Sequence, residues 1–146
     1  MAFRLIDRLT DKQVQELHAL YQQEWWTNQR RLEDIRRMLA GTGVIVAFED
    51  ASTGELVAFS RVLTDGVYRA HLFDVIVRDS HRGQGLGKAI VEAVVNHPVV
   101  GKVEKIILSC RTELVPFYER WGFTTELGPD VHVMVRPGPR TSAVPT

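Results

Sequence analysis

The sequence predicts a single domain of mixed α/β (α+β) structure, in which about four helices flank a mixed, mostly antiparallel sheet. At 146 residues the chain is long enough for one domain with a substantial core and too short for two. Short apolar runs typical of strands are interspersed with segments whose apolar residues recur at helical spacing. We place the domain at residues 1–136. We expect a disordered tail over 137–146, which is rich in Pro, Ser and Thr and has no periodic pattern.

The first half of the chain is expected to run strand, helix, helix and then three strands. Thr10 and Asp11 offer N-cap chemistry to the first helix, and Gly41 ends the second. The pair Asp65-Gly66 is a strong signal for a tight hairpin between the last two strands. In chain order, strands are expected over 3–8, 44–48, 55–63 and 67–77, and helices over 11–26 and 31–40.

The second half begins with a glycine-rich loop that leads from a strand into a helix. Pro98 ends that helix, and a later short helix must hold Pro116 in its first turn, where the missing N–H does least harm. The loop is expected over 82–87, helices over 86–97 and 114–121, and strands over 103–110, 123–126 and 131–136. This order of elements predicts a largely antiparallel sheet with one parallel crossover.

Composition excludes several classes of partner. Lys plus Arg and Asp plus Glu number 18 each, so the formal net charge is zero and no global field attracts nucleic acid or an anionic membrane. The single cysteine, Cys110, excludes an intramolecular disulfide framework and fits a reducing compartment. The first residues do not resemble a signal peptide, and no apolar run approaches the roughly 20 residues of a membrane span. We therefore expect a cytoplasmic protein with no nucleic-acid or membrane partner.

The segment 75–88 is the most informative part of the chain. A strand, a glycine-rich loop and a helix follow one another here, which directs unpaired backbone N–H groups and the positive end of the helix dipole at one place. Such a place binds anions, and glycines let the backbone approach phosphates closely. A Walker loop would need Gly at position 82 and Ser or Thr at 89, where the chain has Arg82 and Ala89. On spacing alone, a glycine-rich connection without a ligand is the alternative.

Two motifs resemble those of the GNAT superfamily of N-acetyltransferases. Arg82-Gly83-Gln84-Gly85-Leu86-Gly87 is similar to the family's pyrophosphate motif, Gln/Arg-x-x-Gly-x-Gly/Ala. The segment 117–123, Phe-Tyr-Glu-Arg-Trp-Gly-Phe, resembles the family's Phe-Tyr-x-x-x-Gly-Phe, and the element order matches over residues 3–136. The resemblance implies a sheet that splays open beside the glycine loop. It also implies acetyl-CoA as co-substrate, no metal, and pantetheine between the fourth and fifth strands.

The resemblance also implies which residues bind acetyl-CoA. Backbone N–H groups of the strand before the loop would bind the pantetheine and polarise the acetyl carbonyl, and the loop would cradle the pyrophosphate. These residues are Val75, Ile76, Val77, Arg82, Gly83, Gln84, Gly85, Leu86, Gly87 and Lys88. Arg120 matches a position that is often basic and near the phosphates, although a solvated helix charge explains it equally well. Arg111 stands where many family members carry Asn, so that role is not transferred.

The implied reaction is direct attack of a neutral amine on the acetyl thioester. Tyr118 matches the family's general acid, since a phenol with a pKa of about 10 suits donation to a leaving thiolate; the alternative is a core aromatic. Asp74 stands where acidic residues are frequent in the family, and strand alternation would place it with Leu72 and Ile76. We predict Tyr118 and Asp74 as catalytic, with His71, Glu24 or water as alternative bases and a purely structural Asp74 as a further alternative.

The first two helices border the acceptor site in this superfamily. Aromatic faces and a carboxylate there would hold a cationic or ring-bearing amine, although Tyr21 and Trp25, four residues apart, also fit a core face. The predicted acceptor-binding residues are Tyr21, Glu24, Trp25, Trp26 and His71. The sequence thus predicts an acetyl-CoA-dependent N-acetyltransferase, a monomer or homodimer, for the primary amine of a small molecule. The alternatives are a protein lysine or N-terminal acceptor and a non-catalytic acyl-CoA sensor, against which the retained Tyr118 argues.

Overall fold

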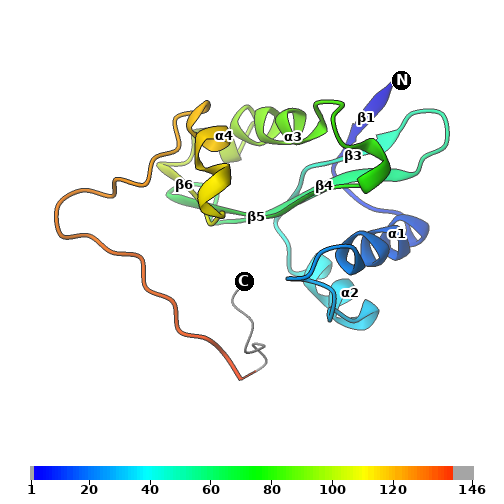
Figure 1. Ribbon diagram of the computed structural model, residues 1–146, viewed down its shortest axis with the longest axis horizontal. Helices are drawn as coiled ribbons and strands as arrows, with labels where there is room; N and C mark the ends of the chain where they lie inside the picture. The colour runs from blue at the N-terminus through cyan, green and yellow to red at the C-terminus, as the bar shows by residue number, and fades with distance from the viewer. Residues whose placement is uncertain (1, 140–146) are drawn as a thin grey trace. The chain divides into compact units, whose positions relative to one another are not determined.

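A computed structural model describes residues 2–139 (Figure 1). The chain divides into two compact units, whose described parts are residues 2–109 and 110–139, and each is treated by itself below. The tail predicted over 137–146 lies outside the described residues from position 140 onward.

The first unit contains a six-stranded sheet in the order β1-β3-β4-β5-β6, with β2 also paired to β4. Every pairing is antiparallel except that of β5 with β6, which is parallel. The strands are β1 (Phe3–Ile6), β2 (Val44–Ile45), β3 (Ala47–Asp50), β4 (Leu56–Thr64), β5 (Arg69–Val77) and β6 (Lys105–Leu108). The predicted mixed, mostly antiparallel sheet with one parallel crossover is confirmed.

Helices cover both faces of this sheet (Figure 1). They are α1 (Asp11–Gln22), α2 (Leu32–Ala40) and α3 (Leu86–Val95), with the 3₁₀ turns η1 (Asp79–His81) and η2 (Val100–Lys102). One core cluster joins α1 and α2 to the sheet, and the other joins α3 to it. Thr10 caps α1 through a capping box with Gln13, as a Thr at that position allows.

Helix α1 ends at Gln22, four residues before the predicted end at 26. The hydroxyl of Thr27 donates to the Tyr21 carbonyl at 2.8 Å, and the Gln23 side chain donates to the Val77 carbonyl at 3.0 Å. These side chains satisfy groups on the end of the helix and on β5, so the chain leaves the helical path here. Trp25 and Trp26 therefore lie in a turn.

A β-bulge in β5 changes which residues share a face of the sheet. Phe59 pairs with Ile76 and Arg61 pairs with Phe73, so two steps along β4 oppose three along β5. Leu72 accordingly lies in the α3 core and Ile76 in the α1–α2 core. The extra residue is Asp74, whose φ of 58° is unusual for a residue other than glycine. The prediction that Asp74 shares a face with both Leu72 and Ile76 was wrong, because it assumed unbroken alternation.

The sheet opens at the end of β5. The pairing of β5 with β6 stops at Leu72 and Leu108, so residues 73–77 have no strand partner on their β6 side within the first unit. This is the splay that the family resemblance predicted. It leaves backbone N–H and C=O groups available directly before the glycine loop.

The second unit contains one short helix, α4 (Val115–Glu119), preceded by the 3₁₀ turn η3 (Thr112–Leu114). Pro116 lies in the first turn of α4, as predicted. The strands predicted over 123–126 and 131–136 are absent from the described part of this unit, which was an error. Gly128 and Asp130 have φ values of 102° and 61°, which turn the chain between them. A favourable strand pattern is not enough without a partner for its backbone groups.

Gly101 tests how tightly η2 packs on the end of α3. A Cβ added at Gly101 would lie 2.6 Å from the Val95 carbonyl oxygen. We expect Gly101→Ala to lower the free energy of unfolding by about 1–3 kcal/mol, because the backbone has to move. The matched control is Gly41→Ala, whose added Cβ meets nothing closer than 3.8 Å. Urea unfolding of both variants is the measurement, and equal stability of the two would contradict this packing.

Candidate functional site

The glycine loop places an open cradle at the start of α3. Gly83 and Gly85 have φ values of 80° and 79°, and a Cβ at either position would meet no described atom within 4 Å. Gly85 is the N-cap of α3 and supplies no side chain to the helix. The first bond of the helix runs from the Ala89 N–H to the Gly85 carbonyl at 3.0 Å, so the N–H groups of 86–88 have no partner within the helix. Backbone donors, dipole and open space fit a pyrophosphate.

Arg82 in the loop and Lys88 in the first turn of α3 form ion pairs with carboxylates. The Nη2 atom of Arg82 lies 2.8 Å from Glu24 Oε1 and 3.0 Å from Asp79 Oδ1. Lys88 lies 3.9 Å from Glu92, which is a weak surface pair. Arg82 is half exposed in this arrangement, so a bound phosphate would compete with Glu24 and Asp79 for it. The structure thereby joins Glu24, predicted for the acceptor, to Arg82, predicted for the cofactor.

A buried ionic cluster is centred on the bulged residue Asp74. Its Oδ2 atom accepts from Tyr21 Oη at 2.9 Å, from Arg30 Nη1 at 2.7 Å and from Arg61 Nε at 2.7 Å. The side chain of Asp74 is only 4% exposed. Arg30 also stacks on the Tyr21 ring, and Arg61 on the Phe73 ring, each at 4.6 Å. Each arginine is thus held by both a charge and a ring.

This cluster weakens Asp74 as a proton acceptor. Burial by itself would raise the pKa of Asp74, but the two guanidinium groups outweigh burial and hold the pKa below its ordinary value. Burial, and then the Asp74 charge, raise the pKa of Tyr21, which therefore stays protonated as a donor. Asp74 is a carboxylate at neutral pH, and its Oδ2 atom already accepts three hydrogen bonds.

The remaining residues predicted for the acceptor are only partly brought together. His71 stacks on Phe73 with ring centroids 4.1 Å apart, and burial, followed by the charge of Arg61, lowers its pKa. Tyr21 is fully buried in the α1–α2 core as well as bonded to Asp74. Trp26 packs against that core, whereas Trp25 is 46% exposed. The three aromatic residues predicted to form one group thus have different environments. Tyr21 lies in the core, Trp26 packs against it, and Trp25 lies at the surface.

The sequence analysis did not identify Arg30 and Arg61, the two arginines that contact Asp74. Arg61 is the one charged side chain within β4, and that position in an otherwise buried strand was a usable signal. Arg30 lies before α2 in a polar stretch with no such signal. Their common partner could not be anticipated, because 44 residues separate Arg30 from Asp74 and 13 separate Arg61 from it.

The second unit holds the other predicted catalytic side chain. Burial, and then the nearby Cys110 group, raise the pKa of Tyr118 to about 12, so the phenol keeps its proton at neutral pH. Its ring meets Phe117 and Phe123 edge-on at 5.0 and 6.0 Å. Arg120, the C-cap residue of α4, stacks on Phe117 at 4.8 Å. Tyr118 is thus a packed aromatic residue whose phenol is protonated at neutral pH.

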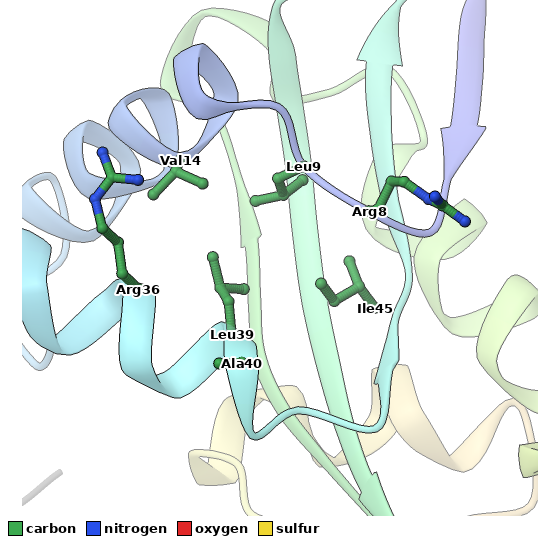
Figure 2. A pocket seen from close by; sticks show the side chains of 7 residues that line it. All are labelled: Arg8, Leu9, Val14, Arg36, Leu39, Ala40 and Ile45. Carbon is green, nitrogen blue, oxygen red and sulfur yellow. The ribbon is translucent and has the colours of Figure 1, made fainter.

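Two cavities of the first unit are lined by other residues. One, of about 330 Å³, lies between α1, α2 and the β1–α1 connection. Figure 2 shows Leu9, Leu39 and Ile45 among its walls. The second, of about 460 Å³, is lined by residues such as Leu5, Gln13 and His97. Within residues 2–139, no group of His, Cys, Asp and Glu side chains is arranged to hold a metal ion. In the same residues, no helix is long and apolar enough to cross a membrane.

Comparison with known proteins identifies the family of the chain. Residues 6–133 match the family model described as an acetyltransferase (GNAT) domain. The chain belongs to this family. GNAT acetyltransferases use acetyl-CoA as co-substrate.

Several relatives carry names that state an acceptor. The chain is 36% identical over 99 residues to glucosamine 6-phosphate N-acetyltransferase 1 of Oryza sativa, covering 64% of this chain and 59% of that protein. It is also 36% identical over 99 residues to the chloroplastic serotonin N-acetyltransferase 2 of the same species, covering 66% of this chain and 50% of that protein. The chain therefore spans between half and three-fifths of these relatives.

Solved structures share the fold over nearly the whole chain. A GNAT-family protein of Xanthomonas campestris is 28% identical, with a TM-score of 0.77 and 95% of each chain covered. Glucosamine-6-phosphate N-acetyltransferase of Arabidopsis thaliana, at 23% identity and a TM-score of 0.70, shares the fold over 94% of this chain and 99% of that one.

The glycine cradle generates a binding prediction. Gly85→Asp would place a carboxylate at the helix N-terminus, and we expect acetyl-CoA binding to fall below detection in isothermal titration calorimetry. The fold should survive, because Asp is a good N-cap and tolerates a left-handed backbone better than most residues. Gly85→Asn, which has the same size without the charge, is the control and should bind more tightly than the Asp variant. Unchanged affinity in a folded Gly85→Asp protein would remove the cradle from the site.

The Arg82 contacts generate a second binding prediction. Glu24→Gln removes one of the two carboxylates that hold Arg82, so the arginine becomes more available to the phosphates. We expect acetyl-CoA to bind about two- to five-fold more tightly, the scale of one surface ion pair. Glu33→Gln, a change at an exposed carboxylate paired with Arg31 on α2, is the control and should have no effect. Weaker binding to the Glu24 variant would mean that Glu24 positions Arg82 for the phosphates.

Proposed function

We propose that the chain binds acetyl-CoA at the glycine cradle and transfers the acetyl group to the primary amine of a small molecule by direct attack. The observation that carries this proposal is the adjacency of two features. One is the uncapped start of α3 beside open glycines, and the other is the unpaired edge of β5 over residues 73–77. An anion-binding helix end beside free strand donors suits a long ligand with a diphosphate at one end. Relatives named for glucosamine 6-phosphate and serotonin support a small acceptor.

Each feature has a role in this proposal. Bound acetyl-CoA supplies the acetyl thioester. The N–H groups of residues 86–88, with Arg82 and Lys88, hold its diphosphate, and Gln84 lies exposed in the same loop. Backbone N–H groups on the open edge of β5, within residues 75–77, bind the pantetheine and polarise the acetyl carbonyl; the Val77 carbonyl already accepts from Gln23. Tyr118 donates the proton that the departing thiolate needs, for which its retained proton is suited.

The identity of the base is narrowed by the electrostatics of the first unit. Asp74 is bonded to two guanidinium groups and has a lowered pKa, so we propose that it positions the arginines instead of accepting the proton. His71 has a lowered pKa and is neutral at pH 7, which leaves a ring nitrogen able to accept a proton directly or through water. Glu24 is paired with Arg82. His71 or water therefore replaces Asp74 as the proposed base.

A panel of amines tests the function. Release of free thiol from acetyl-CoA is measured with polyamines, arylalkylamines, amino sugars and amino acids, beside peptides with a lysine or a free N-terminus. Turnover of a small amine faster than every peptide is expected. Faster turnover of peptides would favour a protein acceptor, for which a 26% identical relative from Glycine max is named as a histone acetyltransferase. Binding of acetyl-CoA without thiol release from any amine would favour a sensor.

Tyr118 is tested by removing its proton and keeping its ring. We expect Tyr118→Phe to lower kcat by about 10²-fold or more, the usual scale for a positioned acid, with little change in acetyl-CoA affinity. The ring contacts with Phe117 and Phe123 remain, so the fold should be retained. Tyr68→Phe is the control, because Tyr68 is 60% exposed in the first unit. A kcat within a factor of two of the unmodified enzyme would assign the proton donation to water or another group.

A further inference from the structure

The Asp74 cluster contains more positive charge than its carboxylate neutralises. Two guanidinium groups, Arg30 and Arg61, share one carboxylate oxygen, and the third donor, Tyr21, is neutral. His71, which faces the same cluster across Phe73, has a lowered pKa and adds no charge at pH 7. The cluster therefore has a net charge of about +1 beside the open end of β5.

Several guanidinium donors in the cluster are not used. Arg61 donates through Nε to Asp74, and within residues 2–139 neither of its Nη atoms has a hydrogen-bond partner. Arg30 contacts Asp74 and the sulfur of Met38 through Nη1 and is also hydrogen-bonded to the side chain of Tyr21. In the same residues no side-chain nitrogen or oxygen is both fully buried and without a partner, so these free donors reach solvent. The side chains of Arg30 and Arg61 are 32% and 13% exposed.

The free donors are held in fixed positions. Asp74 fixes one edge of each guanidinium, and the rings of Tyr21 and Phe73 fix the planes, each at 4.6 Å. An arginine whose plane and one edge are fixed presents its other edge to a ligand with little further loss of conformational entropy. Planar groups with paired oxygens, such as carboxylates, and phosphates match that edge.

We propose that Arg30 and Arg61, positioned by Asp74, bind an anionic group of the acceptor, so that the substrate class is a primary amine that also bears a phosphate or a carboxylate. The inference rests on the proposed function and narrows it. A purely cationic amine, which the aromatic residues Tyr21, Trp25 and Trp26 indicated, would meet a net positive cluster whose carboxylate is already shared by two arginines. Asp74 is the bulged residue and directly precedes Val75 on the open edge of β5. The anionic end of the acceptor would therefore be held beside that edge.

The two acceptors named among the relatives differ in this property. Glucosamine 6-phosphate carries a phosphate, whereas serotonin carries no anionic group, and this chain is equally identical to both of the proteins named for them. Overall identity therefore does not choose between the two kinds of acceptor. The charge of the Arg30–Asp74–Arg61 cluster favours the anionic kind.

Steady-state kinetics with matched acceptors test the inference. Glucosamine 6-phosphate is compared with glucosamine, and 6-aminohexanoate with hexylamine, in thiol-release assays at constant ionic strength. We expect the unmodified protein to show kcat/KM at least about 10-fold higher for the anionic member of one pair, a difference of about 1.4 kcal/mol. The pair that shows the preference distinguishes phosphate from carboxylate recognition. Equal kcat/KM within both pairs would overturn the inference and leave the acetyltransferase function standing.

Variants then assign the preference to the cluster. Arg61→Gln and Arg30→Gln should each reduce the preference about 10-fold, through a higher KM for the anionic acceptor, with the neutral acceptor and acetyl-CoA affected less than about three-fold. Arg30→Gln provides a second readout if Arg61→Gln is unstable, because Arg30 is the more exposed of the two. Arg36→Gln, on α2 and paired with Asp11, is the control and should keep the full preference.

Two results would decide against the cluster. An undiminished preference in folded Arg30 and Arg61 variants would place anion recognition elsewhere. Thiol release with no amine at all, despite measurable acetyl-CoA binding, would instead overturn the proposed function, and this inference with it.

Discussion

The bonds between the Asp74 carboxylate and its three donors are the interaction on which the rest of the candidate site depends. A left-handed backbone at a non-glycine residue costs about 1–2 kcal/mol, whereas hydrogen bonds to a charged group contribute about 1.5–3 kcal/mol each. The cluster therefore stabilises the bulge by more than the backbone conformation costs. With the bulge in place, Phe73 and Asp74 both meet Arg61, and Leu72 and Ile76 face opposite cores.

The same region of β5 connects the acceptor side to the cofactor side. The turn after α1 reaches the end of β5 through Gln23, which donates to the Val77 carbonyl, and reaches the glycine loop through Glu24 on Arg82. Tyr21, on the last turn of α1, bonds Asp74. Helix α1 and the turn after it are thus attached to both ends of the segment 74–82. In the proposed function, a movement of the loop on binding phosphate would displace the turn that carries Glu24 and Trp25.

Sequence reasoning succeeded where the cause of a structure is local. Thr10 with Gln13 forms a capping box within one turn, Pro116 occupies the first turn of α4, and the glycines before α3 determine an open helix start. It failed where the cause is distant. The bulge interrupts an alternation that looked regular, Arg30 and Asp74 meet across 44 residues, and the strand patterns over 123–136 require partners that no local signal supplies. The open start of α3 was therefore predictable from the sequence, whereas the cluster around Asp74 was not.

The zero net charge of the chain conceals a local asymmetry with a mechanistic meaning. The start of α3 directs its dipole and free N–H groups at one place, and the Arg30–Asp74–Arg61 cluster carries one excess positive charge at another, with β5 between them. Both places suit anions, whereas an imidazole can accept the proton of the amine only while it is neutral. His71 meets that condition because burial, followed by the charge of Arg61, disfavours its protonated form. In the proposed function, Arg61 would therefore both attract the anionic group of the acceptor and keep the neighbouring imidazole of His71 neutral, ready to receive the proton of the amine.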